Sequence, residues 1–470
     1  MSSTGSVRFV DVVVRGVRCD VLVEDGRIAR VDPADAEPPR RHDPLDVVDG
    51  DGGELLPAVH DHHIHLAALA SALGSVEVGP PAVHTLPELA TALAAADSTL
   101  PAGRWIRAVG YHESVAGPLD RALLDRLVPT RPTRVQDRSG LRWSMNSAAL
   151  DLIGALDATH PGIHRDARGR PTGALDRADD WIRAATGGEF PDLAPVGRAL
   201  AALGVTGVTD CTPYQDPSGP IAIAEAVRSA ALPQQVVLTG GLELVDVELP
   251  SEVQRGPVKL VLDEPHLPEL SELVDAIQAA HGAGRGVALH VVTAPTLAFA
   301  IAAWREAGPT RGDRIEHGSV IAPAAIGPIA ELGLTVVTQP AFVAERGDRY
   351  LAEVDDDHDD LYRCATLLER GIPVAASSDA PYTAPDPWRA IEAAVRRRTR
   401  DGHELGPAER LSVQRALELF TGDPSDPGRR HRRVEPGAIA DLVLLQRPLD
   451  GETLPAAADV RATYRAGRAL

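Results

Sequence analysis

Short apolar segments recur along the chain, and each is bounded by glycine, proline or polar residues. Eight candidates for buried strands occur at residues 55–66, 204–213, 234–240, 257–264, 286–293, 313–320, 334–340 and 373–381. Most are followed by a stretch such as 267–284, in which apolar residues return at three- and four-residue spacing, the period of a helix. Eight strand-then-helix repeats predict an α/β protein with a (β/α)8 TIM barrel over residues 55–410.

One long stretch does not follow this rhythm. Residues 75–195 lack the strand-helix alternation, and we expect an inserted subdomain there, after the first barrel strand. Without it the barrel region holds about 235 residues, close to the roughly 250 that are typical of such barrels.

The two ends of the chain carry a different pattern. Residues 7–31 alternate apolar and polar side chains around the turn at Glu24, Asp25 and Gly26, which is typical of antiparallel strands. Residues 434–448 and 460–470 have the same character. We therefore predict that residues 1–54 and 411–470 build one small composite β domain, a β-sandwich.

Composition excludes several classes of function. The formal net charge of −20 argues against a nucleic-acid partner, which needs a basic face. No apolar run approaches the roughly 20 residues that cross a bilayer, and residues 1–14 lack the pattern of a signal peptide. Cysteines 19, 211 and 364 are too widely spaced to indicate a disulfide framework or a thiolate metal site. We expect a cytoplasmic protein.

The first strand candidate ends in a histidine pair. His63 and His65 flank Ile64, and side chains two residues apart on a strand point to the same side. Both imidazoles can therefore reach one metal ion. Taken alone this pair is a weak signal, because buried histidines that only satisfy hydrogen bonds are common.

Other ligand-type residues fall at corresponding places in later strand candidates. Lys259 lies in the fourth, His290 in the fifth, His317 in the sixth and Asp379 in the eighth. Active sites of such barrels lie at the C-terminal ends of the strands. Imidazole and carboxylate groups bind zinc, manganese, iron or nickel, and the absence of thiolates from this set favours zinc.

Lys259 is the only lysine in a chain that otherwise uses arginine as its cation. This suggests a position that needs a nucleophilic or carboxylatable amine, which arginine does not offer. A surface lysine without function is the competing interpretation.

The order HxH, Lys, His, His, Asp resembles the binuclear amidohydrolase superfamily. Within it, several segments are similar to the marker segments of the amidohydrolase 3 group, to which N-substituted formamide deformylases belong. These segments are LPAVHDHHIHL (56–66), RSGLRWSMNSAAL (138–150), RPTGALDR (170–177), DRIEHGSV (313–320), VVTQPAF (336–342), SSDAP (377–381) and EPGAIADLVLL (435–445).

The resemblance implies a role for each ligand-type residue. His63 and His65 would bind a first metal ion, His290 and His317 a second, and a carbamate on Lys259 would bridge the two. Asp379 would bind the first ion and act as the catalytic base. A metal-bound hydroxide would then attack a formamide, amide or cyclic amide of a small molecule.

The chain departs from the group in the region that would contact substrate. Leu141 stands where the group usually has histidine, and Ala58 replaces a glycine. Four further residues are expected to line the substrate pocket, although each could equally be a structural hydrogen-bonding residue: His112, Arg138, Gln339 and Tyr382.

Two other functions fit the same residues. The metal barrel could act as a deaminase, isomerase or decarboxylase, since a fold does not fix a function. A barrel protein without catalysis is the third reading. The sequence leaves open the substrate, the choice between one and two metal ions, and whether the chain forms a homo-oligomer.

Overall fold

The computed structural model describes residues 6–33, 45–186, 190–214, 217–353, 358–451 and 453–470. The chain divides into two compact units. Unit 1 comprises residues 1–69 and 192–470, and unit 2 comprises residues 70–191. Parts of the expected β domain (1–5 and 34–44) and of the expected insertion (187–189) lie outside the described residues.

Unit 1 begins with an antiparallel meander, as the alternating sequence predicts. Its sheet has the order β3-β2-β1-β4, in which β4 adds in parallel to β1. The turn between β2 and β3 places Asp25 and Gly26 at φ 50° and 75°, a left-handed conformation that glycine adopts without strain. The strands are β1 (Ser6–Val14), β2 (Val17–Glu24), β3 (Arg27–Pro33) and β4 (Leu45–Asp49).

The end of the chain returns to this layer. A second antiparallel sheet has the order β25-β24-β23-β5, and it pairs the late strand β23 with the early strand β5. Phe9 and Tyr464 meet edge to face at 4.8 Å between ring centroids, inside an apolar core that both chain ends supply. The strands are β5 (Leu55–Pro57), β23 (Leu442–Leu445), β24 (Val460–Arg465) and β25 (Arg468–Ala469).

Parallel strands form the centre of unit 1 in two sheets, of order β15-β14-β13-β6 and β16-β17-β18-β19-β20. All eight strands that the sequence predicts are present. A ninth, β15 (Val253–Arg255), is short and pairs in parallel with β14; it was not expected. The eight are β6 (Val59–Ile64), β13 (Val205–Asp210), β14 (Gln235–Leu238), β16 (Val258–Val261), β17 (Val287–Val291), β18 (Arg314–His317), β19 (Thr335–Thr338) and β20 (Val374–Ala376).

Backbone hydrogen bonds join the edges of these two sheets on both sides. Asp379 donates to the carbonyl of His63 at 2.8 Å, and His65 donates to the carbonyl of Ala380 at 3.0 Å. On the other side, the amide of Lys259 in β16 donates to the carbonyl of Gly240, just after β14, at 2.9 Å. The segments that carry the ligand-type residues are therefore held to one another by the backbone.

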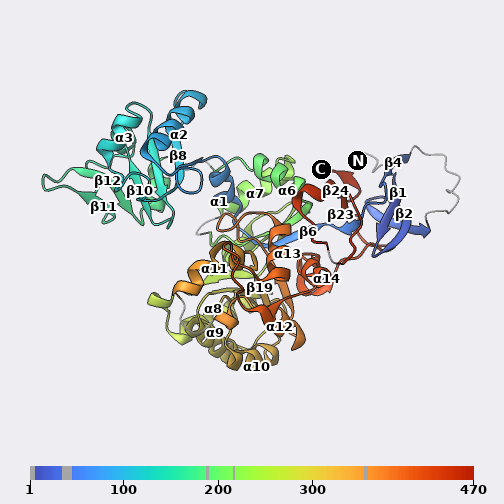
Figure 1. Ribbon diagram of the computed structural model, residues 1–470. Helices are drawn as coiled ribbons and strands as arrows, with labels where there is room; N and C mark the ends of the chain where they lie inside the picture. The colour runs from blue at the N-terminus through green and yellow to red at the C-terminus, as the bar shows by residue number, and fades with distance from the viewer. Residues whose placement is uncertain (1–5, 34–44, 187–189, 215–216, 354–357, 452) are drawn as a thin grey trace. The chain divides into compact units, whose positions relative to one another are not determined.

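Helices separate most of the parallel strands. Helices α8, α9 and α10 pack next to one another, and α8 and α9 contact β17 (Figure 1). The apolar residues of α8 that the sequence places on one face, Leu273, Val274 and Ile277, are buried. The helices are α1 (Leu66–Leu73), α6 (Ala194–Ala202), α7 (Ser218–Arg228), α8 (Leu270–Gly282), α9 (Ala294–Ala307), α10 (Pro323–Glu331), α11 (Ala341–Glu353), α12 (Ala365–Glu369), α13 (Pro387–Arg396) and α14 (Val413–Glu418).

Short elements complete unit 1. The hairpin of β21 and β22 packs against β19 and β20. These elements are β21 (Gly422–Asp423), β22 (Asp426–His431), η1 (Leu242–Asp246), η2 (Glu264–His266), η3 (His358–Asp360), η4 (Pro407–Glu409) and η5 (Ala457–Asp459).

Unit 2 is a mixed sheet of order β11-β12-β10-β9-β8-β7 with its own apolar cores. Strands β7, β8 and β9 are parallel and the other pairs are antiparallel, which explains why the sequence there loses its regular rhythm. The elements are β7 (Val76–Glu77), α2 (Leu86–Thr99), β8 (Ile106–Tyr111), α3 (Arg121–Leu127), β9 (Thr133–Asp137), β10 (Arg142–Met145), α4 (Ser147–Leu152), β11 (Ile163–Arg165), β12 (Pro171–Asp176) and α5 (Asp179–Ala185).

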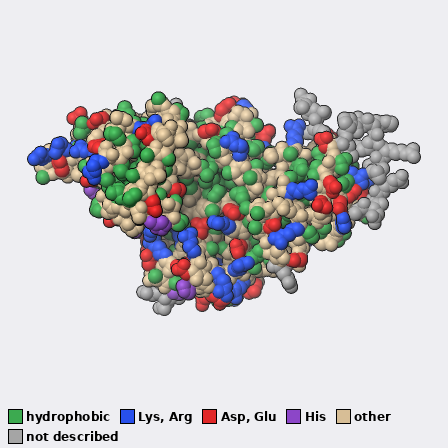
Figure 2. Space-filling view, turned by 45° about the horizontal axis from the view of Figure 1, so that its top comes forward, with side chains coloured by type: hydrophobic (Ala, Val, Ile, Leu, Met, Phe, Trp, Pro, Cys, Tyr) green, Lys and Arg blue, Asp and Glu red, His purple; other side chains and the backbone are tan. Residues whose placement is uncertain are grey.

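Among the described residues, no helix combines the length and apolar character needed to cross a membrane. On the face drawn in Figure 2, acidic and basic side chains are intermingled.

Candidate metal centre

All six predicted ligands belong to unit 1: five lie at, next to or just beyond the C-terminal ends of its parallel strands, and Lys259 lies within β16. Two of them lie at the end of β6, and one each belongs to β16, β17, β18 and the segment after β20. Because these strands run in the same direction, their ends carry the side chains toward one end of the sheets. The six are His63, His65, Lys259, His290, His317 and Asp379.

The carboxylate of Asp379 lies among three of the imidazoles. Its Oδ1 is 3.2 Å from Nε2 of His65 and 3.5 Å from Nε2 of His63. Its Oδ2 is 3.8 Å from Nδ1 of His317. The ring of His290 meets that of His317 at 4.5 Å between centroids. One compact cluster therefore holds all four histidines and the carboxylate.

Oxygen atoms of neighbouring residues hold the outer nitrogens of these rings. Nδ1 of His317 donates to Oε1 of Gln339 at 2.9 Å, because an amide oxygen can only accept. Nδ1 of His63 lies 2.5 Å from Oε2 of Glu316. In both rings this contact occupies Nδ1 and leaves Nε2 as the other ring nitrogen. His65 shares the pattern through its Nδ1, which lies 3.2 Å from Oγ1 of Thr212.

Four buried polar atoms of the predicted ligands have no hydrogen-bond partner within the described part of the chain. They are Nε2 of His63, Nε2 of His317, Oδ1 of Asp379 and Nζ of Lys259. Buried polar groups are normally paired, so unpaired ones need an explanation. Two imidazole nitrogens and a carboxylate oxygen are a donor set that fits a divalent transition ion.

Burial sets the charge state of the imidazoles. It lowers the pKa of His63 and of His317 well below the usual value, and the charge of Lys259 adds to this effect in both. Burial and Lys259 also lower the pKa of His290 to about 4. Neutral imidazoles are the form that binds metal ions. The charge of Lys259 thus contributes to the lowered pKa of all three rings.

Burial also raises the pKa of Asp379, against the opposing effect of His65. Lys259 itself is 6% exposed, at the second position of β16.

The backbone is unusual at two of the predicted ligands. His317 has φ 70° and Asp379 has φ 56°, in the left-handed region that only a few per cent of residues other than glycine adopt. At His317 this conformation interrupts the strict alternation of the strand. As a result Glu316 and His317, although adjacent in sequence, both contact the cluster.

Among the described residues, two groups of side chains have a spacing that could hold an ion: His63 with His317 and Asp379, and His63 with Cys211 and Glu316. In the second group Glu316 is already engaged. Its Oε1 lies 2.5 Å from Nε of Arg314, and its Oε2 faces His63. The first group retains its free donor atoms and is the better candidate.

The expected substrate residues lie in different surroundings. Gln339 is buried, and its amide nitrogen donates to Ser377 while its oxygen holds His317. Tyr382 is 56% exposed, with its ring 5.7 Å from that of His65. His112 and Arg138 belong to unit 2, where His112 Nδ1 lies 2.8 Å from Oγ of Ser114.

Glu316 and Thr212 contact the cluster without having been singled out in the sequence. A signal was present for Glu316, since it directly precedes His317, but strand alternation assigns neighbours to opposite faces. Thr212 lies near the end of the second strand candidate, as ligand-type residues do in other candidates.

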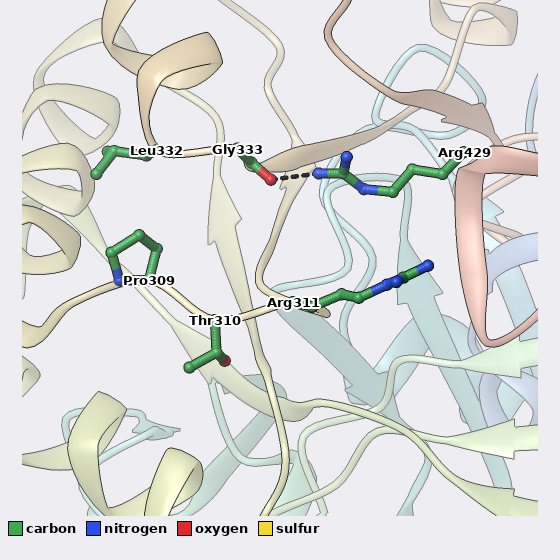
Figure 3. Close-up of a pocket in the computed structure, with 6 residues that line it drawn as sticks. All are labelled: Pro309, Thr310, Arg311, Leu332, Gly333 and Arg429. Carbon is green, nitrogen blue, oxygen red and sulfur yellow. Dashed lines mark hydrogen bonds between the residues drawn. The ribbon is translucent and has the colours of Figure 1, made fainter.

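A separate cavity of about 390 Å³ lies at the opposite ends of the strands (Figure 3). Residues 309–311 precede β18 and residues 332–333 precede β19. Arg429 donates to the carbonyl of Gly333 there at 2.5 Å, and Arg311 forms an ion pair with Asp426. These arginines are engaged in structural contacts, away from the ligand cluster.

The α/β fold carries a cluster of histidines near the C-terminal ends of its parallel strands. This combination defines the class of metal-binding α/β proteins. The profile of the Amidohydrolase family matches residues 46–470. The chain therefore belongs to the amidohydrolase family, which confirms the resemblance seen in its motifs.

Individual proteins agree with this assignment. The chain is 25% identical to the N-substituted formamide deformylase of Arthrobacter pascens, over 92% of this chain and 91% of that one. The fold is similar to those of uncharacterized metal-dependent hydrolases from Pyrococcus furiosus (TM-score 0.75, 22% identity, 94% and 99% of the two chains) and Pyrococcus horikoshii (0.76, 19%, 94% and 98%).

Proposed function

We propose that this protein hydrolyses an amide-like C–N bond of a small molecule with the help of one or two divalent ions, zinc foremost. The first ion would be held by His63, His65 and Asp379, and the second by His290 and His317. Lys259 would bridge them as a carbamate. Formamides, amides and cyclic amides are the substrates that we expect.

One observation carries this proposal. Each of His63, His65 and His317 has its Nδ1 next to a side-chain oxygen, and three of the histidines surround the carboxylate of Asp379. Holding the outer nitrogen of an imidazole in this way fixes its tautomer and aims the inner nitrogen, as in known metal sites. A purely structural cluster would pair the inner nitrogens too, yet those of His63 and His317 have no hydrogen-bond partner among the described residues.

The residues of the chain would share the work of the reaction. A divalent ion held there supplies a Lewis acid that polarises a carbonyl and acidifies a water molecule. Asp379 would accept the proton of the attacking water and pass it to the departing nitrogen, since its carboxylate contacts the cluster directly. Lys259 is buried and its charge acts on His63, His290 and His317, and it offers an amine to which CO2 can add.

The fold supports the same proposal. We infer that the parallel strands of unit 1 close into the (β/α)8 barrel, because hydrogen bonds join the two sheets at both edges. Residues 1–54 and 411–470 would form the composite β domain, in which both ends share one core. Residues 75–195 would be the insertion.

The relative with a stated reaction supports cleavage of a C–N bond. N-substituted formamide deformylase is similar to this chain over nearly its full length, at 25% identity. The alternatives remain a deaminase, an isomerase or a decarboxylase on the same metal-binding fold.

Elemental analysis of the purified protein, followed by assays on a panel of formamides, linear amides and cyclic amides before and after chelation, tests this function. We expect one to two zinc-like ions per chain and amide hydrolysis that chelation abolishes. A metal-free protein whose activity survives chelation would overturn the mechanism. Release of ammonia from an amino-substituted ring, without amide hydrolysis, would favour the deaminase.

A further inference from the structure

Glu316 stands between two partners inside the protein. Its Oε2 lies 2.5 Å from Nδ1 of His63, and its Oε1 lies 2.5 Å from Nε of Arg314. His63 and Glu316 are fully buried and Arg314 nearly so. Nη2 of Arg314 also donates to Sγ of Cys211 at 3.4 Å. The row from Cys211 through Arg314 and Glu316 to His63 therefore runs through the buried interior.

We propose that Glu316 is a positioning residue for the metal centre and that Arg314 sets its orientation. A carboxylate facing Nδ1 holds the proton on that nitrogen, because an ionised carboxylate can only accept. His63 is then left with a lone pair on Nε2, the nitrogen that faces Asp379. This inference rests on the proposed function, since it assigns the tautomer that a metal ligand needs.

The role of Arg314 follows from charge. A guanidinium keeps its proton at any ordinary pH and has no acceptor atom, so it selects an oxygen on the neighbouring side chain. With a carboxylate at position 316 both partners face oxygen. With an amide there, the oxygen would turn to Arg314 and the NH2 group would turn to His63.

Glu316→Gln therefore makes a sharp test, although it changes only one atom of the side chain. The amide NH2 would donate to Nδ1 of His63 and shift the ring proton to Nε2, where it blocks metal binding. We expect zinc affinity, measured by competition with a chromophoric chelator, to fall about 10- to 100-fold, as for other residues that orient metal ligands. In 15N spectra of metal-free protein with labelled histidine, the His63 signals should change from the Nδ1–H to the Nε2–H pattern.

Asp313 offers a matched control just before the same strand. Asp313 is a buried carboxylate that also holds a histidine, His281, at 3.0 Å, but it precedes β18 and lies at the opposite end of it from His317. Asp313→Asn removes a buried charge of the same kind. It should reduce thermal stability and leave zinc affinity within about threefold of wild type, since it touches no ligand-orienting bond.

The combination Arg314→Met with Glu316→Gln separates positioning from simple loss of charge. Without the guanidinium the amide is free to turn its oxygen to His63, and replacing a buried ion pair with neutral groups is often tolerated. We expect the double variant to bind zinc more tightly than Glu316→Gln alone and to recover the Nδ1–H pattern. A role in packing alone would make the double variant worse than either single one.

The spectrum of the wild-type protein gives a test that needs no variant at position 316 to fold. His63→Asn identifies the signals of this ring by their loss. An Nε2–H tautomer in the metal-free wild type would overturn the inference, as would Glu316→Gln with unchanged zinc affinity and an unchanged tautomer. Failure of the wild type to bind any divalent ion would instead overturn the proposed function, and the tautomer would still be read from the spectrum.

Discussion

Gln339 holds His317 across two neighbouring strands: Oε1 of the amide accepts from Nδ1 of the ring at 2.9 Å, and Nε2 of the amide donates to Oγ of Ser377 at 3.0 Å. Both ends of the amide are therefore committed, and its orientation is fixed. The side chain that the sequence assigned to the substrate pocket supports a candidate ligand in this structure.

Replacing Gln339 should therefore affect metal binding. Gln339→Met keeps the volume but removes the acceptor for His317, and we expect zinc affinity to fall about 10-fold or more. Gln339→Glu keeps an acceptor and should retain more of the zinc affinity. Titration of metal-free protein with zinc measures both. If Gln339→Met bound zinc as tightly as the wild type and had a raised KM, Gln339 would be assigned to the substrate pocket instead.

Asp379→Asn should separate chemistry from folding. Asparagine tolerates the left-handed backbone, so the φ of 56° at this position causes little strain in the variant. The amide cannot take up a proton, and we expect turnover to fall at least about 100-fold, the lower end of what a positioned acid or base supplies. Steady-state kinetics with a melting curve measure both effects. Near-normal turnover would assign the base to another residue.

Lys259→Arg should lose most activity although it keeps the charge. A guanidinium forms no carbamate and accepts no metal ion. Lys259→Ala should also be inactive, but it leaves space into which acetate or propionate can bind. Activity assays with and without these acids test this, and restoration of the alanine variant alone is the expected signature. A fully active Lys259→Arg would leave the lysine a structural role.

Removing metal should destabilise the protein. A ligand that binds only the folded state stabilises it by about 2.7 kcal/mol at a concentration 100 times its Kd. We therefore expect chelation to lower the Tm, and zinc but not magnesium to restore it, because the donor set is rich in imidazole. Differential scanning fluorimetry gives the readout. An unchanged Tm would contradict tight binding to the folded protein.

Glu409 should stabilise the fold at neutral pH. Burial acts to raise its pKa, but hydrogen bonds from Thr366, Arg363 and Cys364 outweigh it and the pKa is lowered. Such a carboxylate stabilises the folded protein at pH values above its unfolded pKa of about 4.3. This stabilisation is lost as the pH falls through the pKa of the group in the folded protein. Glu409→Gln should thus cost about 1 to 3 kcal/mol at pH 7 and less below about pH 4.

Denaturant midpoints of the wild type and of Glu409→Gln, at pH 7 and below about pH 4, measure this difference in stability. Glu404→Gln is the control, because Glu404 also forms ion pairs with arginine, through Arg398 and Arg410, but its side chain is 44% exposed. Its loss should have little effect, as for most surface ion pairs. Equal destabilisation by both variants would mean that burial of the ion pair does not decide its strength.

The sequence predicted the parallel strands well because fully buried strands are short apolar runs between glycine, proline and polar residues. It also placed His63 and His65 on one side, since their spacing matches the alternation of a strand. It did not find β15, which is three residues long and has two exposed side chains, so that it carries no apolar run.

The residues that orient the ligands were harder to find. Glu316 contacts the cluster only because His317 departs from strand geometry, and no rule of alternation includes such a residue. Gln339 was noticed, but its hydrogen bond to His317 depends on the register of two strands. Leu141, at the position where the family resemblance leads one to expect histidine, is 47% exposed, and nothing in the structure explains it.

The edge-to-face contact of Phe9 and Tyr464 has a consequence for how the protein is made. More than 450 positions separate the two rings. At about 5 to 20 residues per second, a ribosome needs roughly 20 to 90 seconds to reach the second ring after the first. During that time the apolar faces of β1 and β2 lack the partners that β23 and β24 later provide. The newly made amino-terminal strands are thus a natural point of contact for chaperones until translation reaches the last strands.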